Sequence, residues 1–118
     1  MAYSSFEDLL VWKDACDLAV AVYEMLENCS DFGLKNQMTR SAVSVASNIA
    51  EGAERNSAPD FIRFLHIAKG SAAELRTQAF IAERVGIITR EQADSTIEAT
   101  RKLGSQLQAL ARSLKPKT

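Results

Sequence analysis

Apolar residues recur three and four positions apart along nearly the whole chain, which is the spacing of one face of an α-helix. In the clearest segment eight residues share one arc: Phe61, Phe64, Leu65, Ala68, Ala72, Leu75, Ala79 and Ala82. A narrow seam typical of helical bundles is formed by Ala93, Ile97, Thr100, Leu103, Leu107, Leu110 and Leu114. A third segment carries Leu34, Met38, Ala42, Val45, Ile49 and Ala53 at the same spacing. The pattern predicts an all-α chain.

The first apolar segment is less regular than the others. Its main stripe comprises Leu9, Trp12, Ala15, Cys16, Ala19, Val22, Tyr23 and Leu26, whereas Leu10, Val20 and Met25 fall outside it. Val43, Ile67 and Ile81 also lie away from the apolar arcs of their helices. Several apolar residues that point away from a core suggest a subunit interface. We therefore expect the chain to self-associate.

Three helix starts are marked by a hydroxyl residue with an acid or amide three positions later, the pattern of a capping box. These hydroxyl residues are Ser5, Ser57 and Thr89, and Asp31 marks a fourth start. We expect helices at about 6–28, 32–55, 58–86 and 89–114, followed by a short disordered basic tail at 115–118. Connections of a few residues place consecutive helices antiparallel. The predicted fold is a single domain over residues 1–118, an antiparallel up-down-up-down four-helix bundle.

The composition is that of an ordinary globular protein. The 118 residues are 47% apolar and 25% charged, which excludes disorder, collagen and low complexity. No apolar run approaches the ~18 residues of a membrane span. The N-terminus is acidic and lacks the basic and apolar regions of a signal peptide. We expect a cytoplasmic protein without membrane contact, whose two cysteines are reduced thiols.

Residues suited to catalysis are few. His66 is the one histidine, so no pair of histidines could hold a metal inside the bundle. Cys16 and Cys29 do not form a Cys-x-x-Cys motif, and Cys16 falls on the Trp12 stripe as a small core residue would. We predict no enzyme, metal, cofactor or small-molecule substrate. A nuclease built on Arg63 and His66 is the weaker alternative.

Charge is distributed unevenly, although the net charge is only −1. Residues 1–31 hold seven acidic residues and one lysine, a net −6, which leaves +5 for residues 32–118. Basic side chains on the outer arcs of two neighbouring helices suit contact with a phosphate backbone. The candidates are Arg40, Arg55, Arg63, Lys69 and Arg76. The alternative is a solvated face, or pairing with the acidic first helix of another subunit through Asp17 and Glu24.

Two of the predicted helices carry small and polar residues where large apolar ones would be usual. One run covers residues 41–52 and the other residues 68–73, which include Gly70. A glycine inside a helix costs about 1 kcal/mol relative to alanine, and close approach of the two helices is the simplest compensation. We expect a partly buried polar network there, formed by Asn48, Glu51, Ser71 and Glu74. A ligand site is the alternative.

Several segments resemble the bacterial four-helix bundle protein family, also called the 23S ribosomal RNA intervening-sequence protein family. They are FEDLLVWKDA at 6–15, LKNQMTRS at 34–41, NIAEGAER at 48–55 and FLHIAKGSAAEL at 64–75. Together they cover residues 6–85 in the family's order and spacing, and the fourth helix matches in pattern alone. The matching polar motif residues have no assigned role: Gln37, Arg40, Asn48, Glu51, Arg55, Gly70, Ser71 and Glu74.

The resemblance implies an antiparallel bundle with no established enzymatic activity. Members are similar to the accessory protein of diversity-generating retroelements, a pentameric barrel that associates with a reverse transcriptase and nucleic acid. This chain departs from them in its acidic balance and in Thr39-Arg40, where many relatives carry two adjacent basic residues. We expect a non-enzymatic homo-oligomer, a ring of five subunits, that binds or scaffolds nucleic acid or a nucleoprotein. The alternative is a protein–protein adaptor with no nucleic-acid contact.

Overall fold

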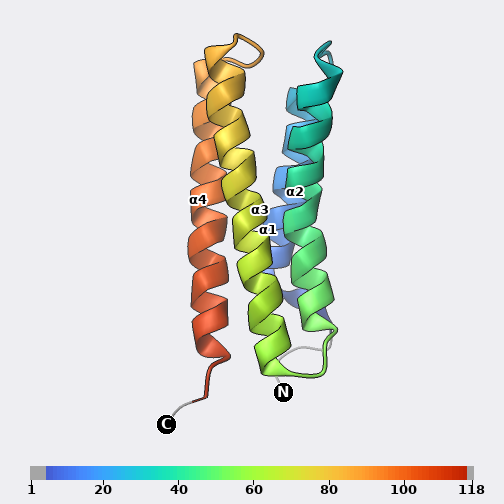
Figure 1. Cartoon of the computed structure of the whole chain (residues 1–118), viewed down its shortest axis with the longest axis vertical. Coiled ribbons are helices and arrows are strands. Elements are labelled where there is room, and N and C mark those ends of the chain that lie inside the picture. Colours follow the sequence, from blue (N-terminus) through green and yellow to red (C-terminus); the bar gives the residue numbers. More distant parts are fainter. Residues whose placement is uncertain (1–4, 117–118) are drawn as a thin grey trace.

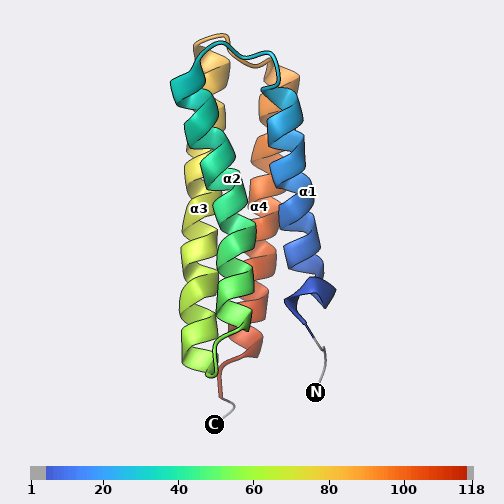
Figure 2. The same cartoon turned by 90° about the vertical axis from the view of Figure 1, so that its right-hand side faces the viewer.

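The computed structural model describes residues 5–116, and all regular structure in this range is helical. A 3₁₀ helix, Phe6–Asp8, precedes four α-helices: α1 (Leu10–Met25), α2 (Phe32–Ala53), α3 (Ala58–Arg84) and α4 (Arg90–Ser113). Consecutive helices are joined at alternate ends of an elongated molecule (Figures 1 and 2). The prediction of an all-α chain with four helices is confirmed. Of the expected tail, residues 117–118 lie outside the described residues.

Three of the four predicted helix starts are capped as expected. The side chains of Asp31 and Ser57 each accept a hydrogen bond from the backbone N–H three residues later, at 3.0 and 3.3 Å. Thr89 and Gln92 form a capping box, in which each side-chain oxygen accepts from the other residue's N–H at 3.0 and 2.9 Å. These bonds satisfy N–H groups that have no partner inside the helix, and they fix where the helix begins.

The first helix differs from the span expected over residues 6–28. Ser5 caps only the 3₁₀ turn, through a 3.0 Å hydrogen bond from the Glu7 N–H, and the backbone is then extended for one residue before α1 begins. This break lets the Phe6 ring pack edge-on against Trp12, with the ring centroids 5.2 Å apart. Residues six apart on a continuous helix point in different directions and would not meet. The end of α1 also comes three residues before the expected one.

The four helices surround one core. α2 packs most extensively against α3, and α3 packs against α4. α1 packs against α2 and, least extensively, against α4. Within residues 5–116, no Cα atoms of α1 and α3, or of α2 and α4, approach within 8 Å across the diagonal of the bundle. α1, the shortest of the four helices, therefore has the smallest total contact with the others.

The apolar arcs predicted for α2, α3 and α4 face the core. All eight residues of the α3 arc are buried, and Val45 and Ile49 of α2 have no exposed surface. The stripe predicted for α1 is wrong in part, because Tyr23 is 53% exposed whereas Val11 and Leu18 are buried. α1 contacts α4 as well as α2, and this second contact turns its buried face toward Val11 and Leu18. None of the helices in the described range is long and apolar enough to cross a membrane.

The close approach between α2 and α3 occurs at Gly52. A Cβ on Gly52 would lie 2.6 Å from the Cβ of Phe64 and 3.1 Å from Cδ1 of Phe61, which is closer than side chains pack. A Cβ on Gly70 would meet no atom within 4 Å, because Gly70 faces solvent. The expectation that Gly70 permits close packing is therefore wrong, and Gly52 has that role.

Candidate nucleic-acid interface

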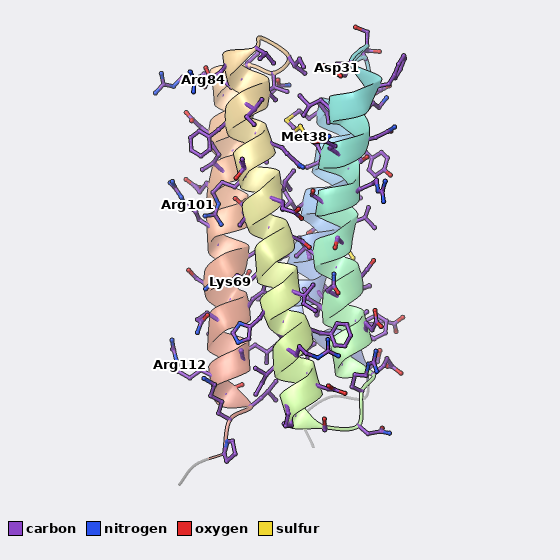
Figure 3. All side chains as sticks on the ribbon, viewed as in Figure 1. Asp31, Met38, Lys69, Arg84, Arg101 and Arg112 are labelled. Carbon is purple, nitrogen blue, oxygen red and sulfur yellow. The ribbon has the colours of Figure 1, made fainter. Side chains whose placement is uncertain are left out.

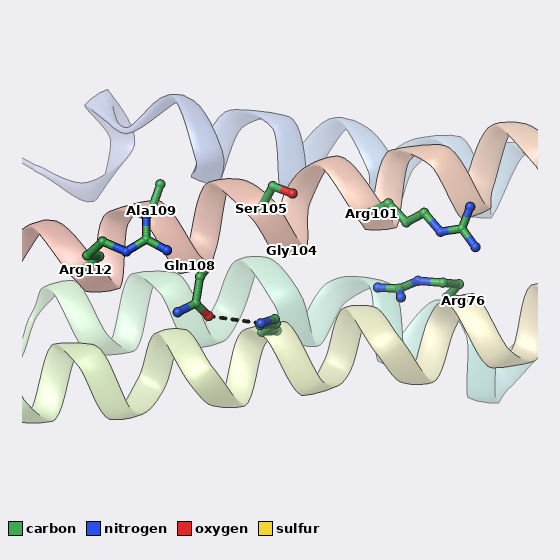
Figure 4. A pocket seen from close by; sticks show the side chains of 8 residues that line it. Arg76, Arg101, Gly104, Ser105, Gln108, Ala109 and Arg112 are labelled. Carbon is green, nitrogen blue, oxygen red and sulfur yellow. Dashed lines mark hydrogen bonds between the residues drawn. The ribbon is translucent and has the colours of Figure 1, made fainter.

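α3 and α4 flank an open groove of about 610 Å³ that contains four basic side chains (Figure 4). The lining residues come from the outer flanks of the two helices: Lys69, Arg76, Arg101, Gly104, Ser105, Gln108, Ala109 and Arg112. Among residues 5–116, no acidic residue contributes to this lining. Arg101 and Arg112 project outward from α4 (Figure 3). The groove, which we call the cationic groove, concentrates positive charge on a chain whose net charge is −1.

A buried threonine of α4 holds Arg76 in the cationic groove. Arg76 Nε donates a 3.1 Å hydrogen bond to Thr100 Oγ1, and this hydroxyl donates in turn to the Ile97 carbonyl at 2.7 Å. Thr100 has no exposed surface, so the bond fixes the guanidinium close to the α4 backbone. Gly104 lies beside the guanidinium without crowding it: a Cβ there would lie 4.0 Å from Arg76 Nη2, an ordinary van der Waals distance. The remaining guanidinium N–H groups can bind an anion in a fixed geometry.

Lys69 is held by an amide rather than by an acid. Its Nζ donates a 3.0 Å hydrogen bond to Gln108 Oε1, drawn as the dashed line in Figure 4. The hydrogen-bond partners of Lys69 and Arg76 are both neutral, so no paired acid offsets the positive charge of either side chain. The ion pairs within residues 5–116 use other basic residues, namely Arg55, Arg63, Arg90 and Lys102. Four positive charges in one groove repel one another, and an anion placed among them relieves that repulsion.

Two of the basic residues predicted for phosphate contact pack on an aromatic ring instead. Arg55 and Arg63 each place the guanidinium over the ring of Phe64, 4.8 and 4.5 Å from its centroid. Each is also paired with an acid: Arg55 with Glu51 at 3.1 Å, and Arg63 with Asp60 at 3.6 Å. These contacts secure the ends of α2 and α3 that meet here, and the acids offset part of the positive charge.

Arg40 lies apart from both groups. It borders a polar hollow of about 330 Å³ between α2 and α3, whose other lining residues are Gln37, Ser41, Ser44, Glu74 and Gln78. Glu74 brings a negative charge to the same hollow. The five basic residues predicted from the sequence therefore fall in three places. Lys69 and Arg76 are the two that lie in the cationic groove.

The polar network expected between α2 and α3 has a different composition. The hydroxyl oxygens of Ser44 and Ser71 lie 2.9 Å apart. Asn48 Nδ2 donates to the Ser44 hydroxyl at 2.9 Å and to the Ser44 carbonyl at 2.8 Å. Glu51 and Glu74 are exposed and take no part in these bonds, since burying a carboxylate without a matched partner is costly. Ser44, which the sequence does not single out, is the residue that joins the two helices.

Val43, expected at a subunit interface, borders an apolar groove of about 510 Å³ between α1 and α2. We call it the apolar groove; Trp12, Val20 and Tyr23 are its largest side chains besides Phe6. Cys16 also lines it. Burial, and after it the neighbouring Asp17 carboxylate, raises the pKa of the Cys16 thiol, which makes the thiol a poor nucleophile at neutral pH.

The other residues expected at an interface lie on two further faces. Ile67 and Ile81 are on the outer face of α3, where they are 41% and 49% exposed. Asp17 and Glu24 lie on the side of α1 that faces α4, each bordering a shallow hollow between these two helices. The predicted interface residues therefore do not form one patch: Val43 borders the apolar groove from α2, Ile67 and Ile81 form an exposed apolar face on α3, and the two acidic residues of α1 lie on a third side.

The side chains considered for catalysis are not brought together. Within residues 5–116, no cluster of histidine, cysteine and carboxylate side chains is placed to hold a metal ion. His66 is exposed on α3. Arg63, its neighbour in the nuclease alternative, is engaged by Phe64 and Asp60.

Arg101 and Arg112 are not among the site residues predicted from the sequence. A signal for them exists, because residues 99–118 contain five basic residues and no acid. Arg101, Ser105, Gln108 and Arg112 also recur at helical spacing on one flank of the leucine seam of α4. Recognising the groove additionally requires knowing that this flank faces Lys69 and Arg76 of α3.

Comparison with known proteins assigns the chain to a family. The model of the family described as 23S rRNA-intervening sequence protein matches residues 7–109, which include all of the cationic groove except Arg112. A solved structure from Bacteroides thetaiotaomicron, a protein with unknown function from the S23 ribosomal protein family, has a TM-score of 0.81 and 28% identity. That match covers 86% of this chain and 98% of the other. No curated protein matches. The chain belongs to the 23S rRNA-intervening sequence protein family, as its motifs predicted.

Proposed function

We propose that this protein is a non-enzymatic, cytoplasmic module that binds the phosphate backbone of nucleic acid, free or within a nucleoprotein. The cationic groove is the observation that carries the proposal, because it gathers four basic side chains with no acid in its lining. Lysine and arginine contacts to phosphates supply most of the sequence-independent affinity of nucleic-acid-binding proteins.

The shape of the groove favours a polymer over a small anion. Arg101 and Arg112 are eleven residues apart on α4, which corresponds to about 16 Å along the helix axis. Ser105 and Gln108 lie between them and add neutral hydrogen-bonding groups. A small anion would reach one or two of the cations, whereas a sugar–phosphate backbone laid along the groove would contact all four.

Binding of a short fluorescently labelled strand, followed by anisotropy, tests this function. We expect affinity to fall as salt is raised, with a slope of log K against log salt of about −3 for four phosphate contacts. Changing Lys69, Arg76, Arg101 and Arg112 together to alanine should weaken binding on the order of 100-fold or more.

A matched variant removes the same charge elsewhere. Changing Lys35, Arg40, Arg55 and Arg63 together to alanine leaves the cationic groove intact and is expected to change affinity only a few-fold. Equal losses in the two variants, or a groove variant that binds like the wild type, would show that the cationic groove is not the binding site.

We also propose that the protein assembles into a closed ring, with five subunits as the family resemblance implies. The apolar groove supports this, because Val20 and Tyr23 in its lining are 56% and 53% exposed in a single chain. On α3, Ile67 and Ile81 form a second exposed apolar face. Burying these two faces against each other would remove apolar surface from water. A contact between two different faces closes into a ring when the rotation per subunit permits.

Two single substitutions test this assembly by size-exclusion chromatography with light scattering. Five copies of the 12.9 kDa chain give about 65 kDa. Val43→Asp damages the apolar groove and Ile67→Asp damages the α3 face, so each variant alone is expected to be a monomer. Mixed together, they should form a dimer through the one remaining pair of intact faces. Phe32→Asp, at another exposed apolar residue, is the control and should leave assembly unchanged. A mixture that stays monomeric would rule out this contact.

The apolar groove also favours a second function, a protein–protein adaptor without nucleic-acid contact. The ratio of nucleic-acid to protein absorbance across the chromatographic peak separates the two functions. An oligomer that carries no nucleic acid and binds no added strand would be the adaptor.

A further inference from the structure

An exposed aromatic side chain stands at one end of the cationic groove. Phe80 is 46% exposed, in contrast to Phe61 and Phe64, which are buried. It follows Arg76 by four residues on α3 and therefore lies one turn beyond it on the same face of the helix. An apolar ring left in water beside a row of cations is a feature that phosphate binding alone does not explain.

Phe80 interrupts the row of cations on α3. Arg76 precedes it by four residues and Arg84 follows it by four. The hydrogen bonds from Lys69 to Gln108 and from Arg76 to Thr100 set the antiparallel register of α3 and α4. Continued by one turn, that register places Phe80 opposite residues at about 96–98 of α4. Glu98 lies in this stretch, so a phosphate is less favoured beside Phe80 than over the four cations of the groove, whereas an uncharged base is not repelled.

We infer that the cationic groove takes single-stranded nucleic acid, with phosphates over the four cations and one base stacked on Phe80. This inference rests on the proposed function and names its substrate class. Single strands are bound by combining a basic track for the backbone with aromatic platforms for the bases. In a duplex the base faces are covered by their neighbours, so a ring on the flank of a helix cannot reach them.

The test uses four labelled probes of equal length: oligodeoxyuridylate, oligouridylate, an abasic strand with the same phosphates, and a duplex. Phe80→Ala is expected to weaken the two base-bearing single strands by about 5- to 100-fold, the range for loss of one stacked base. The abasic strand and the duplex should bind the variant as they bind the wild type. The tighter of the two base-bearing strands identifies the preferred sugar.

Phe32→Ala is the matched control, because Phe32 is also an exposed phenylalanine (68%) and lies on α2, outside the cationic groove. It should leave all four affinities unchanged. Phe80→Trp adds a direct signal, since tryptophan fluorescence at this position should be quenched by a stacked base and not by the abasic strand.

The outcomes separate the two proposals. If Phe80→Ala weakens all four probes equally, or none of them, base stacking is overturned while phosphate binding stands. If the wild type binds no probe in a salt-dependent way, phosphate binding fails and the inference fails with it. Selective loss of the base-bearing single strands, with quenching in Phe80→Trp, supports both.

Discussion

The cationic groove and the apolar groove are alike in position and size but opposite in chemistry. Each lies between two neighbouring helices, and their volumes are about 610 and 510 Å³. The first is lined by four cations with neutral polar residues, and the second by aromatic and aliphatic side chains without a charged residue. The core arcs beneath them are of the same apolar kind. The difference shows that a helical bundle sets where its grooves lie, whereas the few residues flanking each core arc decide what they bind.

The largest effect is expected from reversing charge in the cationic groove. Arg101→Glu combined with Arg112→Glu replaces attraction to phosphate by repulsion, so affinity for a single strand at low salt should fall on the order of 1,000-fold. Assembly, measured by light scattering, should not change, because neither residue lines the apolar groove or belongs to the exposed Ile67 and Ile81 face of α3. Lys35→Glu combined with Arg40→Glu makes the same change in charge on α2, outside the groove, and should have a much smaller effect. Loss of assembly in the first variant would contradict the independence of the two faces.

The next effect concerns the contact between α2 and α3, which lies between the two grooves. Gly52→Ala places a Cβ 2.6 Å from that of Phe64 and forces the helices apart, so unfolding in urea should show a loss of about 1–3 kcal/mol. Gly70→Ala is the matched substitution in open space, and should stabilise by up to about 1 kcal/mol through helix propensity. Equal effects of the two alanines would contradict the close approach at Gly52.

A smaller effect is expected from Thr100→Val, which keeps the shape of the side chain and removes its hydroxyl. Arg76 Nε loses its acceptor, so the free energy of unfolding should fall by about 1 kcal/mol. Strand affinity should fall a few-fold, because the guanidinium is no longer held in place. Thr77→Val, at an exposed hydroxyl on α3, is the control for both measurements. Assembly should be unaffected in either variant.

The smallest expected effect is on the chemical reactivity of Cys16, which lines the apolar groove. The pKa of Cys16 is raised by burial and by Asp17, so less thiolate is present at neutral pH than in an ordinary thiol. In a Cys29→Ser background, alkylation by iodoacetamide should be slower than that of glutathione at neutral pH. The rate should rise with pH as the thiolate forms, and should fall as protein concentration increases, because assembly covers the groove. A rate equal to that of glutathione at every concentration would contradict both expectations.

Most of the fold could be predicted from the sequence because helices carry their own signals. The caps at Asp31, Ser57 and Thr89 and the 3.6-residue period of α2, α3 and α4 depend on residues close together in the chain. The start of α1 is predicted wrongly, because the Ser5 cap serves a 3₁₀ turn that breaks off before α1, and a helical period does not reveal the contact of Phe6 with Trp12. The buried face of α1 depends on contact with α4, which is distant in sequence.

Only half of the candidate site could be predicted from the sequence, because two helices form it. Lys69 and Arg76 follow from the outer arc of α3. Arg101 and Arg112 can be recognised as part of the site only when α4 is known to lie beside α3. Arg55 and Arg63 show the converse. Their positions suit phosphate contact on a helical wheel, yet the wheel does not show Phe64 beneath them or the acids that pair with them.

The joining of consecutive helices at alternate ends has a consequence for how the protein can be used. With four helices, the described chain enters and leaves the bundle at the same end, near Ser5 and Pro116 (Figure 1). In the proposed ring, every subunit would present that end on one rim. A domain fused to either side would be displayed there in several copies, and its weak affinity for a surface or a polymer would be multiplied by multivalency.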